Sequence, residues 1–238
     1  MSNLSDIGFP VNTEEDVNQL LMDVLSGIQQ VACPPFGFYY RFEDESGAQI
    51  FLQANPEQDL MGFNPGFRGL GTASLELIRT VERDTSELDG AYVAKGTEGG
   101  PAFVFDLPDF RRVKPGPLPV SVKVELTAFA TNDLQLLEPD AVKPAEPSLA
   151  PLRDSEEALL GGDPSAPPPQ AHVRIEAVIA TAEKRENAKS KAEFWALSAA
   201  TAAGEISIVA DPVLLVRDAS AGDVVKGSFW LTGKIEKI

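Results

Sequence analysis

Cysteine and histidine are almost absent from this chain. Its 238 residues include one cysteine, Cys33, and one histidine, His172. A lone cysteine excludes an intramolecular disulfide, which is typical of proteins in a reducing compartment. A lone histidine excludes metal sites that need two or more imidazole ligands. We therefore expect a cytoplasmic protein with no metal site and no bound cofactor, in which Cys33 is a small buried apolar residue.

Long apolar segments are missing as well. No stretch approaches the roughly 20 apolar residues that a membrane-spanning helix needs. The first residues, Met1 to Asp6, lack the basic segment and following apolar run that mark a signal peptide. We expect no membrane partner.

The known short catalytic motifs are also absent. The chain has no nucleophile elbow, no phosphate-binding loop and no dinucleotide fingerprint, and we name no catalytic residue. The glycine-rich stretch 64–71 lacks the lysine and the following helix of a phosphate cradle. Two alternatives remain. Asp106 and Asp109 could form a paired acid–base site, and Arg68 could bind an anion in a bidentate fashion, although a turn in which Arg68 pairs with a carboxylate is the simpler interpretation.

Negative charge dominates and is unevenly distributed. The formal net charge is -16. Residues 172–238 contain nine basic and nine acidic side chains, so residues 1–171, with eleven basic and twenty-seven acidic side chains, carry the whole imbalance. An acidic surface disfavours nucleic acid and anionic membranes. The expected partner is a protein or a small ligand, and nucleic acid is an alternative that the net charge disfavours.

Helical periodicity is clear in one segment. From Thr13 to Val31, apolar residues recur at three- and four-residue spacing and form one stripe. Thr13 is a suitable N-cap, acidic residues follow it, and Pro34-Pro35 would end the helix. We expect this amphipathic helix to pack on a sheet.

Period-two alternation marks much of the remaining chain. The expected strands before residue 139 are 36–43, 48–54, 60–63, 73–82, 91–95, 102–107, 120–130 and 134–138. A helix followed by many strands indicates an α+β fold with a mainly antiparallel sheet.

Residues 139–171 differ in composition. They hold eight of the nineteen prolines and few aromatic or β-branched residues. Such a segment buries too little apolar area to offset the entropy of ordering it, so we expect an extended linker or long loop. It would separate an acidic α+β domain, residues 1–138, from a β module, residues 172–238. The rival interpretation is an insertion within one domain.

The C-terminal module has expected strands at 173–181, 193–199, 205–210 and 224–235, and a polar loop at 183–191. Its last strand follows Gly222-Asp223 and carries Gly227-Ser228-Phe229. This layout resembles the OB-fold, a small, partly open five-stranded β-barrel. The resemblance covers residues 172–238 and implies a ligand face on the second and third strands, flanked by the loop between the first two.

Seven residues are candidate ligand contacts. They are Lys184, Arg185, Lys189 and Lys191 of the polar loop, the two tryptophans Trp195 and Trp230, and Arg68. Aromatic rings that stack on bases contribute about 1–3 kcal/mol each in single-strand binders. The simpler interpretation is a solvated loop, neutralised by its own glutamates, and two indoles packed against another element.

The sequence thus predicts a non-catalytic binding or interaction protein. Nucleic-acid or anion binding through the OB-like module is one alternative. A carboxylate-dependent enzyme is the other.

Overall fold

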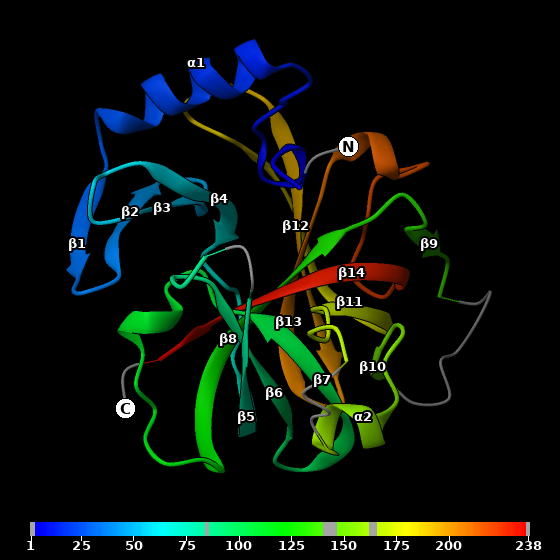
Figure 1. The fold of residues 1–238 in the computed structure, drawn as a ribbon. Coiled ribbons are helices and arrows are strands. Elements are labelled where there is room, and N and C mark those ends of the chain that lie inside the picture. Colours follow the sequence, from blue (N-terminus) through cyan, green and yellow to red (C-terminus); the bar gives the residue numbers. More distant parts are fainter. Residues whose placement is uncertain (1–2, 84–85, 140–146, 162–165, 237–238) are drawn as a thin grey trace.

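The protein is mostly β-structure with a few short helices (Figure 1). The structure is a computed structural model that describes residues 3–83, 86–139, 147–161 and 166–236. Its helices are η1 (Ser5–Ile7), α1 (Glu14–Leu25), η2 (Phe110–Arg112), α2 (Glu156–Gly161) and η3 (Pro212–Leu214), where η denotes a 3-10 turn. Its strands are β1 (Gln29–Cys33), β2 (Gly37–Glu43), β3 (Ala48–Ala54), β4 (Leu60–Phe67), β5 (Ala73–Glu82), β6 (Gly90–Gly96), β7 (Gly99–Asp106), β8 (Val120–Ala130), β9 (Gln135–Leu137), β10 (Ser148–Pro151), β11 (His172–Glu186), β12 (Glu193–Thr201), β13 (Gly204–Ala210) and β14 (Val224–Ile235).

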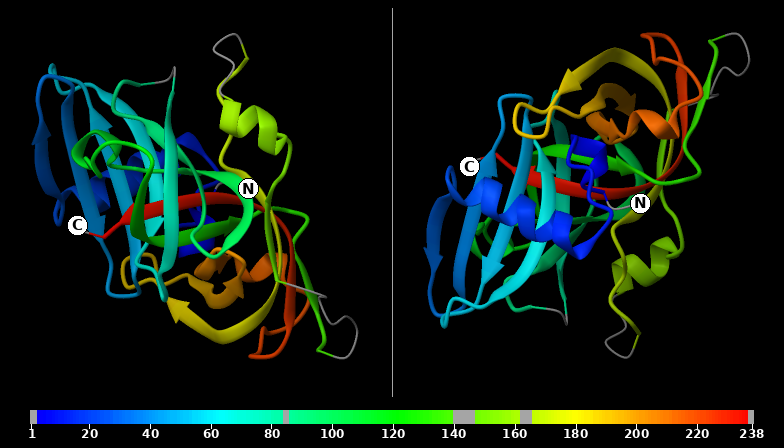
Figure 2. Two further views of the ribbon diagram at one scale, coloured as in Figure 1. Left: turned by 90° about the horizontal axis from the view of Figure 1, so that it is seen from below. Right: turned by 90° about the horizontal axis from the view of Figure 1, so that it is seen from above.

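The first four strands form a small antiparallel sheet in the order β1-β2-β3-β4. β2 and β3 make the hairpin expected from their alternation, with Gly47 at a φ of 93° in the turn, where a side chain would be strained. Seen from above, α1 lies over this sheet (Figure 2). Leu20 and Val24 of α1 are buried in one apolar cluster with Phe42 and Ile50 of the sheet.

Eight further strands close into a barrel. The hydrogen-bonded order is β11-β12-β13-β8-β5-β6-β7-β14, and β14 returns to pair with β11. The β13–β8 and β7–β14 pairings are parallel, and the other pairings of the barrel are antiparallel. β8 and β14 also pair with each other, from Ala128 opposite Leu231 to Val124 opposite Ile235. Side chains from all eight strands meet in one buried apolar cluster.

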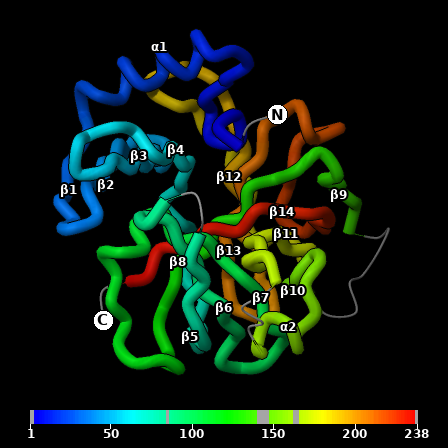
Figure 3. The backbone as a smooth tube through the Cα atoms, viewed as in Figure 1, coloured from blue at the N-terminus to red at the C-terminus, as the bar shows by residue number. Residues whose placement is uncertain are grey.

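The barrel consists of two units with the same order of elements. Unit 1 (residues 73–130) is β5-β6-β7-η2-β8, and unit 2 (residues 172–235) is β11-β12-β13-η3-β14. In each unit the last strand pairs antiparallel with the first strand of its own unit and parallel with the third strand of the other unit. The two units are therefore interlocked, as the chain trace shows where the green and red segments cross (Figure 3). No break in the sheet separates residues 1–138 from residues 172–238.

Different segments cover the outer faces of the two units. Val93 and Val104 of unit 1 pack against Leu159 of α2. Phe194 and Val209 of unit 2 pack against the N-terminal segment and the small sheet.

The helix is shorter than its apolar stripe predicts. Thr13 caps α1 through a capping box with Asp16, as the N-terminal pattern indicates. The helix ends at Leu25, however, and Gln29–Cys33 is strand β1 because its backbone groups pair with β2. Pro34-Pro35 belongs to the turn between these strands and does not stop the helix.

The described parts of 139–171, where the composition led us to expect an extended linker or long loop, contain elements that pack on the barrel. β10 pairs with β11, and Leu159 of α2 is fully buried. Arg79 and Arg83 of the barrel donate hydrogen bonds to the carbonyl oxygens of Leu159 and Pro169. Neighbouring side chains thus supply the burial and hydrogen bonds that the segment's own composition lacks. Residues 140–146 and 162–165 lie outside the described chain.

The polar loop is also shorter than expected. β11 continues to Glu186, because residues as far as Glu186 pair with β12. The charges of residues 183–186 therefore lie on a strand, whereas Lys189 and Lys191 remain in the loop between β11 and β12. None of the described helices combines the length and apolar character needed to cross a membrane.

Candidate functional site

A line of three cavities lies between the small sheet and the barrel. The first, beside Trp230, measures about 190 Å³ and is called the indole pocket. The last, beside η2, measures about 680 Å³ and is called the basic groove. A narrow cavity of about 30 Å³ shares Pro108 with the indole pocket and Lys234 with the basic groove. Only the basic groove falls within the roughly 300–1,000 Å³ range common for ligand sites.

The basic groove gathers four cationic side chains in a protein of net charge -16. Arg41 comes from β2, Arg112 from η2, Lys114 from the segment after η2, and Lys234 from β14. These elements are far apart in the sequence and meet only because β14 crosses the barrel towards the small sheet. The groove is thus a product of the tertiary fold.

Two of the four cations are paired inside the groove. Arg112 Nη1 lies 3.3 Å from Asp109 Oδ2, and Lys234 Nζ lies 3.2 Å from Glu125 Oε1. Arg41 donates a long hydrogen bond, 3.4 Å, to the neutral side chain of Gln29. Within the described chain, neither Arg41 nor Lys114 forms an ion pair. The groove lining thus has four cations against three carboxylates, a net excess of one positive charge, and two of its cations form no ion pair with the described residues.

Asp109 lies at the base of this groove as the N-cap residue of η2. Burial raises its pKa, and the charges of Arg112, Arg41 and Lys234 partly oppose that rise. Glu236, at the edge of the groove, is the remaining acidic lining residue.

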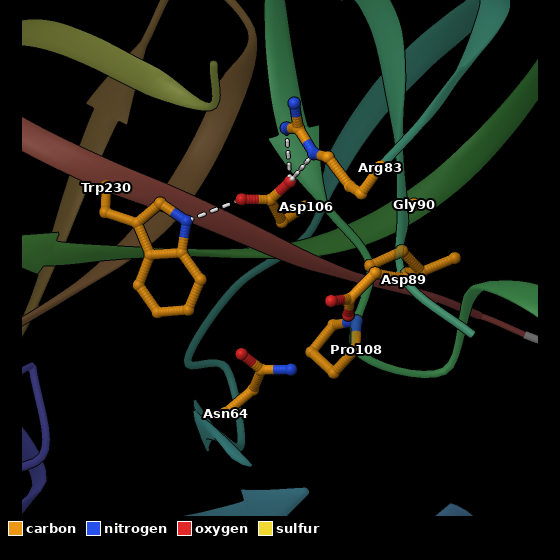
Figure 4. A pocket seen from close by; sticks show the side chains of 8 residues that line it. Asn64, Arg83, Asp89, Gly90, Asp106, Pro108 and Trp230 are labelled. Atoms are coloured by element: carbon orange, nitrogen blue, oxygen red, sulfur yellow. Dashed lines mark hydrogen bonds and ion pairs between the residues drawn. The ribbon is translucent and has the colours of Figure 1, made fainter. Parts of the chain in front are cut away.

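In the indole pocket, Trp230 meets an ion pair (Figure 4). Trp230 Nε1 donates to Asp106 Oδ2 at 2.6 Å. Arg83 donates to Asp106 Oδ1 through Nε at 3.2 Å and through Nη2 at 2.5 Å. Asp106 is therefore fixed by partners on both oxygens and does not act as a free base.

The predicted basic residues of 183–191 are mostly paired. Lys184 lies 3.0 Å from Glu193, Arg185 lies 2.6 Å from Glu183, and Lys191 lies 3.3 Å from Glu186. Arg185 also donates to the carbonyl oxygen of Ser46, and its guanidinium lies over the ring of Phe67. Lys189 lines a separate small cavity beside α1. The structure does not bring these four side chains into one cavity.

The two tryptophans have different environments. Trp195 is 6 % exposed and belongs to the barrel core, with Lys184 Nζ 5.9 Å from the centre of its ring. Trp230 is half-buried and lines the indole pocket, and its ring lies 5.1 Å from the ring of Phe129 at a tilt of 39°. Of the two rings, Trp230 is the one that borders a cavity.

The three residues of the enzyme alternative lie apart. Asp106 lines the indole pocket, whereas Asp109 lines the basic groove. Arg68 follows β4, is 54 % exposed at its side chain, and pairs with Glu43 at 2.8 Å. Each carboxylate has its own arginine partner, so the two do not form the shared acid–base pair that the alternative needs.

Cys33 and His172 are not joined in one site. Cys33 lies in a small cluster with Tyr39 and Leu88, and burial raises its pKa. His172 begins β11 opposite Trp230. Among the described residues, no three histidine, cysteine, aspartate or glutamate side chains gather as a metal site.

Comparison with known protein families, curated proteins and solved structures finds no match for this chain. The site must therefore be interpreted from its own chemistry.

Sequence reasoning missed the cations of the basic groove. Arg41 lies in an alternating strand and Lys234 lies in the last strand, where each resembles an ordinary solvent-facing residue. Arg112 and Lys114 form part of the short basic run 111–114 beside Asp109. That run, unusual in the acidic half of the chain, was the one local signal.

Proposed function

We propose that the protein is a non-catalytic binding protein whose ligand is an anion held in the basic groove. The observation that carries this proposal is the meeting of Arg41, Arg112, Lys114 and Lys234 around a cavity of about 680 Å³. The arrangement suits a small molecule with phosphate or carboxylate groups, because guanidinium and ammonium groups form their strongest hydrogen bonds with such oxygens.

The acidity of the whole chain does not oppose this proposal at physiological salt. The Debye length there is about 8 Å, so charges on distant surfaces are largely screened. Groups that line the groove are closer to the ligand and are partly shielded from solvent. The local excess of cations therefore favours a ligand of negative charge. The net charge of -16 lowers the rate of encounter with large polyanions.

Binding of single-stranded nucleic acid by an OB-like C-terminal surface is the alternative. It would use the outer face of β12 and β13, and Phe194 and Val209 on that face are buried under the N-terminal segment and the small sheet. The paired state of Lys184, Arg185 and Lys191 adds no free charge for a phosphate backbone. These contacts favour the groove over the OB-like surface.

Isothermal titration calorimetry with the full chain tests the proposal. Inorganic tripolyphosphate and citrate are titrated separately at low salt, and a single-stranded oligonucleotide is the third titrant. We expect saturable binding of at least one small anion. Arg41→Ala and Lys114→Ala should each weaken it by about tenfold or more, because a charged hydrogen bond contributes about 1.5–3 kcal/mol.

Arg174→Ala is the matched control, because Arg174 is an exposed arginine of β11 outside the groove. It should leave binding unchanged. Absence of saturable heat with both small anions, or equal losses in the control and the groove variants, would refute the proposal. Tight binding of the oligonucleotide alone would favour the alternative.

A further inference from the structure

The small sheet has two faces with different neighbours, because side chains alternate along each strand. On β2, Tyr39 donates a hydrogen bond to the carbonyl oxygen of Leu88, and Arg41 lines the basic groove, so both lie on the face towards the barrel. Phe42 lies on the other face, in the apolar cluster that includes α1. A ligand that binds the face under α1 therefore does not occupy the basic groove.

α1 covers only part of its face. Phe42 pairs with Ile50 beneath the helix, and the cross-strand pair of Phe38 and Ala54 lies four residues away along β2. Seen from above, the small sheet continues past α1 towards the turn between β3 and β4 (Figure 2). Opposite residues of paired strands share a face, so one row of side chains crosses the four strands at this end. This row, called the open row, consists of Ala32, Phe38, Ala54 and Leu60.

The open row exposes apolar side chains that lie side by side. Leu60 is 50 % exposed, and the adjacent Met61 is 47 % exposed. Phe38 is half-buried, and its ring lies 6.4 Å from the ring of Tyr40, which is also half-buried. Single exposed apolar side chains are ordinary, whereas a contiguous group marks an interaction surface. The open row therefore has the character of a binding surface.

The charges around the open row are negative. Residues 1–67 hold ten acidic side chains and one basic side chain, Arg41, which lies on the opposite face. Glu57 and Asp59 are exposed in the turn that leads into Leu60, and α1 has four acidic residues and no basic residue. Complementary charge favours a partner with lysine or arginine around its apolar contact. A second copy of the chain, with a net charge of -16, would be repelled.

The dimensions of the face suit a helix. Four strands spaced about 4.8 Å apart span about 15 Å, the length of about ten helical residues. α1, with 12 residues, crosses the same strands and buries Leu20 and Val24 on them. A second helix beside α1 would cover the open row with apolar side chains at the same four-residue spacing.

We propose that the open row binds a basic amphipathic helix of a partner protein, which lies beside α1 with its apolar stripe on Phe38 and Leu60. Lysine or arginine side chains that flank the stripe pair with Glu57 and Asp59. This is the common mode of recognition in which an amphipathic helix places its apolar side on an exposed apolar surface. The open row and the basic groove lie on opposite faces of the small sheet, so either proposal can fail while the other stands.

The test is a fluorescence anisotropy titration of a labelled leucine–lysine peptide with the full chain at physiological salt. The peptide has about 14 residues, with leucines at helical spacing on one side and lysines on the other. We expect saturable binding. Leu60→Ser should weaken it by about tenfold or more, because a polar hydroxyl replaces an apolar contact of the open row. Glu57→Gln should weaken it by a smaller factor, since an exposed charge pair is screened by water.

Val216→Ser is the matched control variant, because Val216 is 92 % exposed in the segment after η3 of unit 2. It should leave the titration unchanged. A peptide with glutamate in place of lysine, and one with serine in place of leucine, should not bind. Equally tight binding of either control peptide, absence of saturable binding, or undiminished binding by Leu60→Ser would each overturn the proposal.

Light scattering on size-exclusion chromatography distinguishes a partner helix from a second copy of the chain. We expect the unchanged chain and Leu60→Ser to have the same molar mass in the absence of peptide. A dimer of the unchanged chain that Leu60→Ser converts to a monomer would assign the open row to a second copy, and the proposal would be wrong.

Discussion

The two units of the barrel share one order of elements but differ in what covers them. In unit 1, α2 lies on the outer face and η2 opens onto the basic groove. In unit 2, the N-terminal segment lies on the outer face, and the backbone N–H of Asp211, the N-cap residue of η3, donates to Asp6 at 2.9 Å. The two equivalent turns thus have different neighbours, because η2 borders a cavity and the N-cap residue of η3 is hydrogen-bonded to η1.

This difference indicates which surfaces of the barrel can bind a ligand. A barrel filled with side chains has no interior space for a ligand. Its available sites are the outer positions that no other segment covers. The small sheet covers the barrel incompletely, and the three cavities remain along that line.

Separating the units should have the largest effect. We expect the fragment 172–238 to be unfolded when expressed alone, because β13 and β14 would lose their pairings with β8. Unpaired backbone groups and an exposed apolar interior would follow. Circular dichroism and thermal unfolding of the fragment provide the measurement.

The intact chain cleaved between the units is the matched control for that fragment. Its two pieces should stay associated on size-exclusion chromatography because the strands are interlocked. Cooperative unfolding of the isolated fragment 172–238 would instead establish two domains and contradict the interlocked description.

The contact between Asp6 and the N-cap residue of η3 in unit 2 should make stability depend on pH. Burial raises the pKa of Asp6 from 3.8 to about 8. The folded state therefore holds a proton that the unfolded state releases above about pH 4, so stability should fall as pH rises from about 4 to about 8. The upper bound is about 6 kcal/mol, at about 1.4 kcal/mol per pKa unit. Detachment of η1, which would hydrate Asp6, would make the loss smaller.

Urea unfolding at pH 5 and at pH 8 measures this dependence. Asp6→Asn keeps an oxygen that can accept from the N–H of Asp211 and should largely abolish the pH dependence. Glu57→Gln, on an exposed turn, should leave it as in the unchanged chain. A loss of stability in Asp6→Asn equal to that of the unchanged chain over the same interval would show that Asp6 is not its source.

The packing of α2 on the outer face of unit 1 should contribute several kcal/mol to the free energy of unfolding. Leu159 of α2 is fully buried against β6 and β7, so Leu159→Ala should destabilise the protein by about 2–5 kcal/mol in chemical unfolding. Leu160, the next residue, is 42 % exposed, and Leu160→Ala should cost far less. Similar costs for the two variants would mean that α2 does not dock on the barrel.

The sequence predicts the features that leave a local pattern, and it misses those that depend on contacts between distant segments. Local alternation predicted residues 73–82, 120–130 and 224–235 as strands, which coincide with β5, β8 and β14. It could not predict that β8 and β14 exchange partners between the units, because strand pairing between distant segments leaves no local pattern. The expected boundary at 139–171 rested on composition, which does not reveal that Arg79 and Arg83 bind this segment's carbonyl groups.

The candidate site was predicted less well than the strands, because it also depends on contacts between distant segments. Trp230 was named from its residue type, and it does border a cavity. Arg41 and Lys234 were missed, because each becomes distinctive only when the small sheet and the crossing strand come together. The charges of 183–191 were conspicuous in the sequence, yet Lys184, Arg185 and Lys191 each pair with a nearby glutamate.

The last strands of the two units, β8 and β14, differ in glycine content. β14 carries Gly227 and Gly233, whereas β8 carries no glycine. A Cβ at Gly233 would lie 2.5 Å from the buried ring of Phe105 and 3.0 Å from Val124. Gly233→Ala should therefore destabilise the protein by about 1–3 kcal/mol through overpacking, measured by urea unfolding.

Gly161→Ala is the matched control for that variant. A Cβ at Gly161 meets no atom of the described residues within 4 Å, and alanine favours the end of a helix such as α2, so this change should be neutral or slightly stabilising. If Gly233→Ala were equally neutral, β14 would not approach β7 as closely as the parallel pair of Thr232 with Asp106 requires. The join between the two units would then be looser on the β7 side than on the β13 side, where three residue pairs connect β13 to β8.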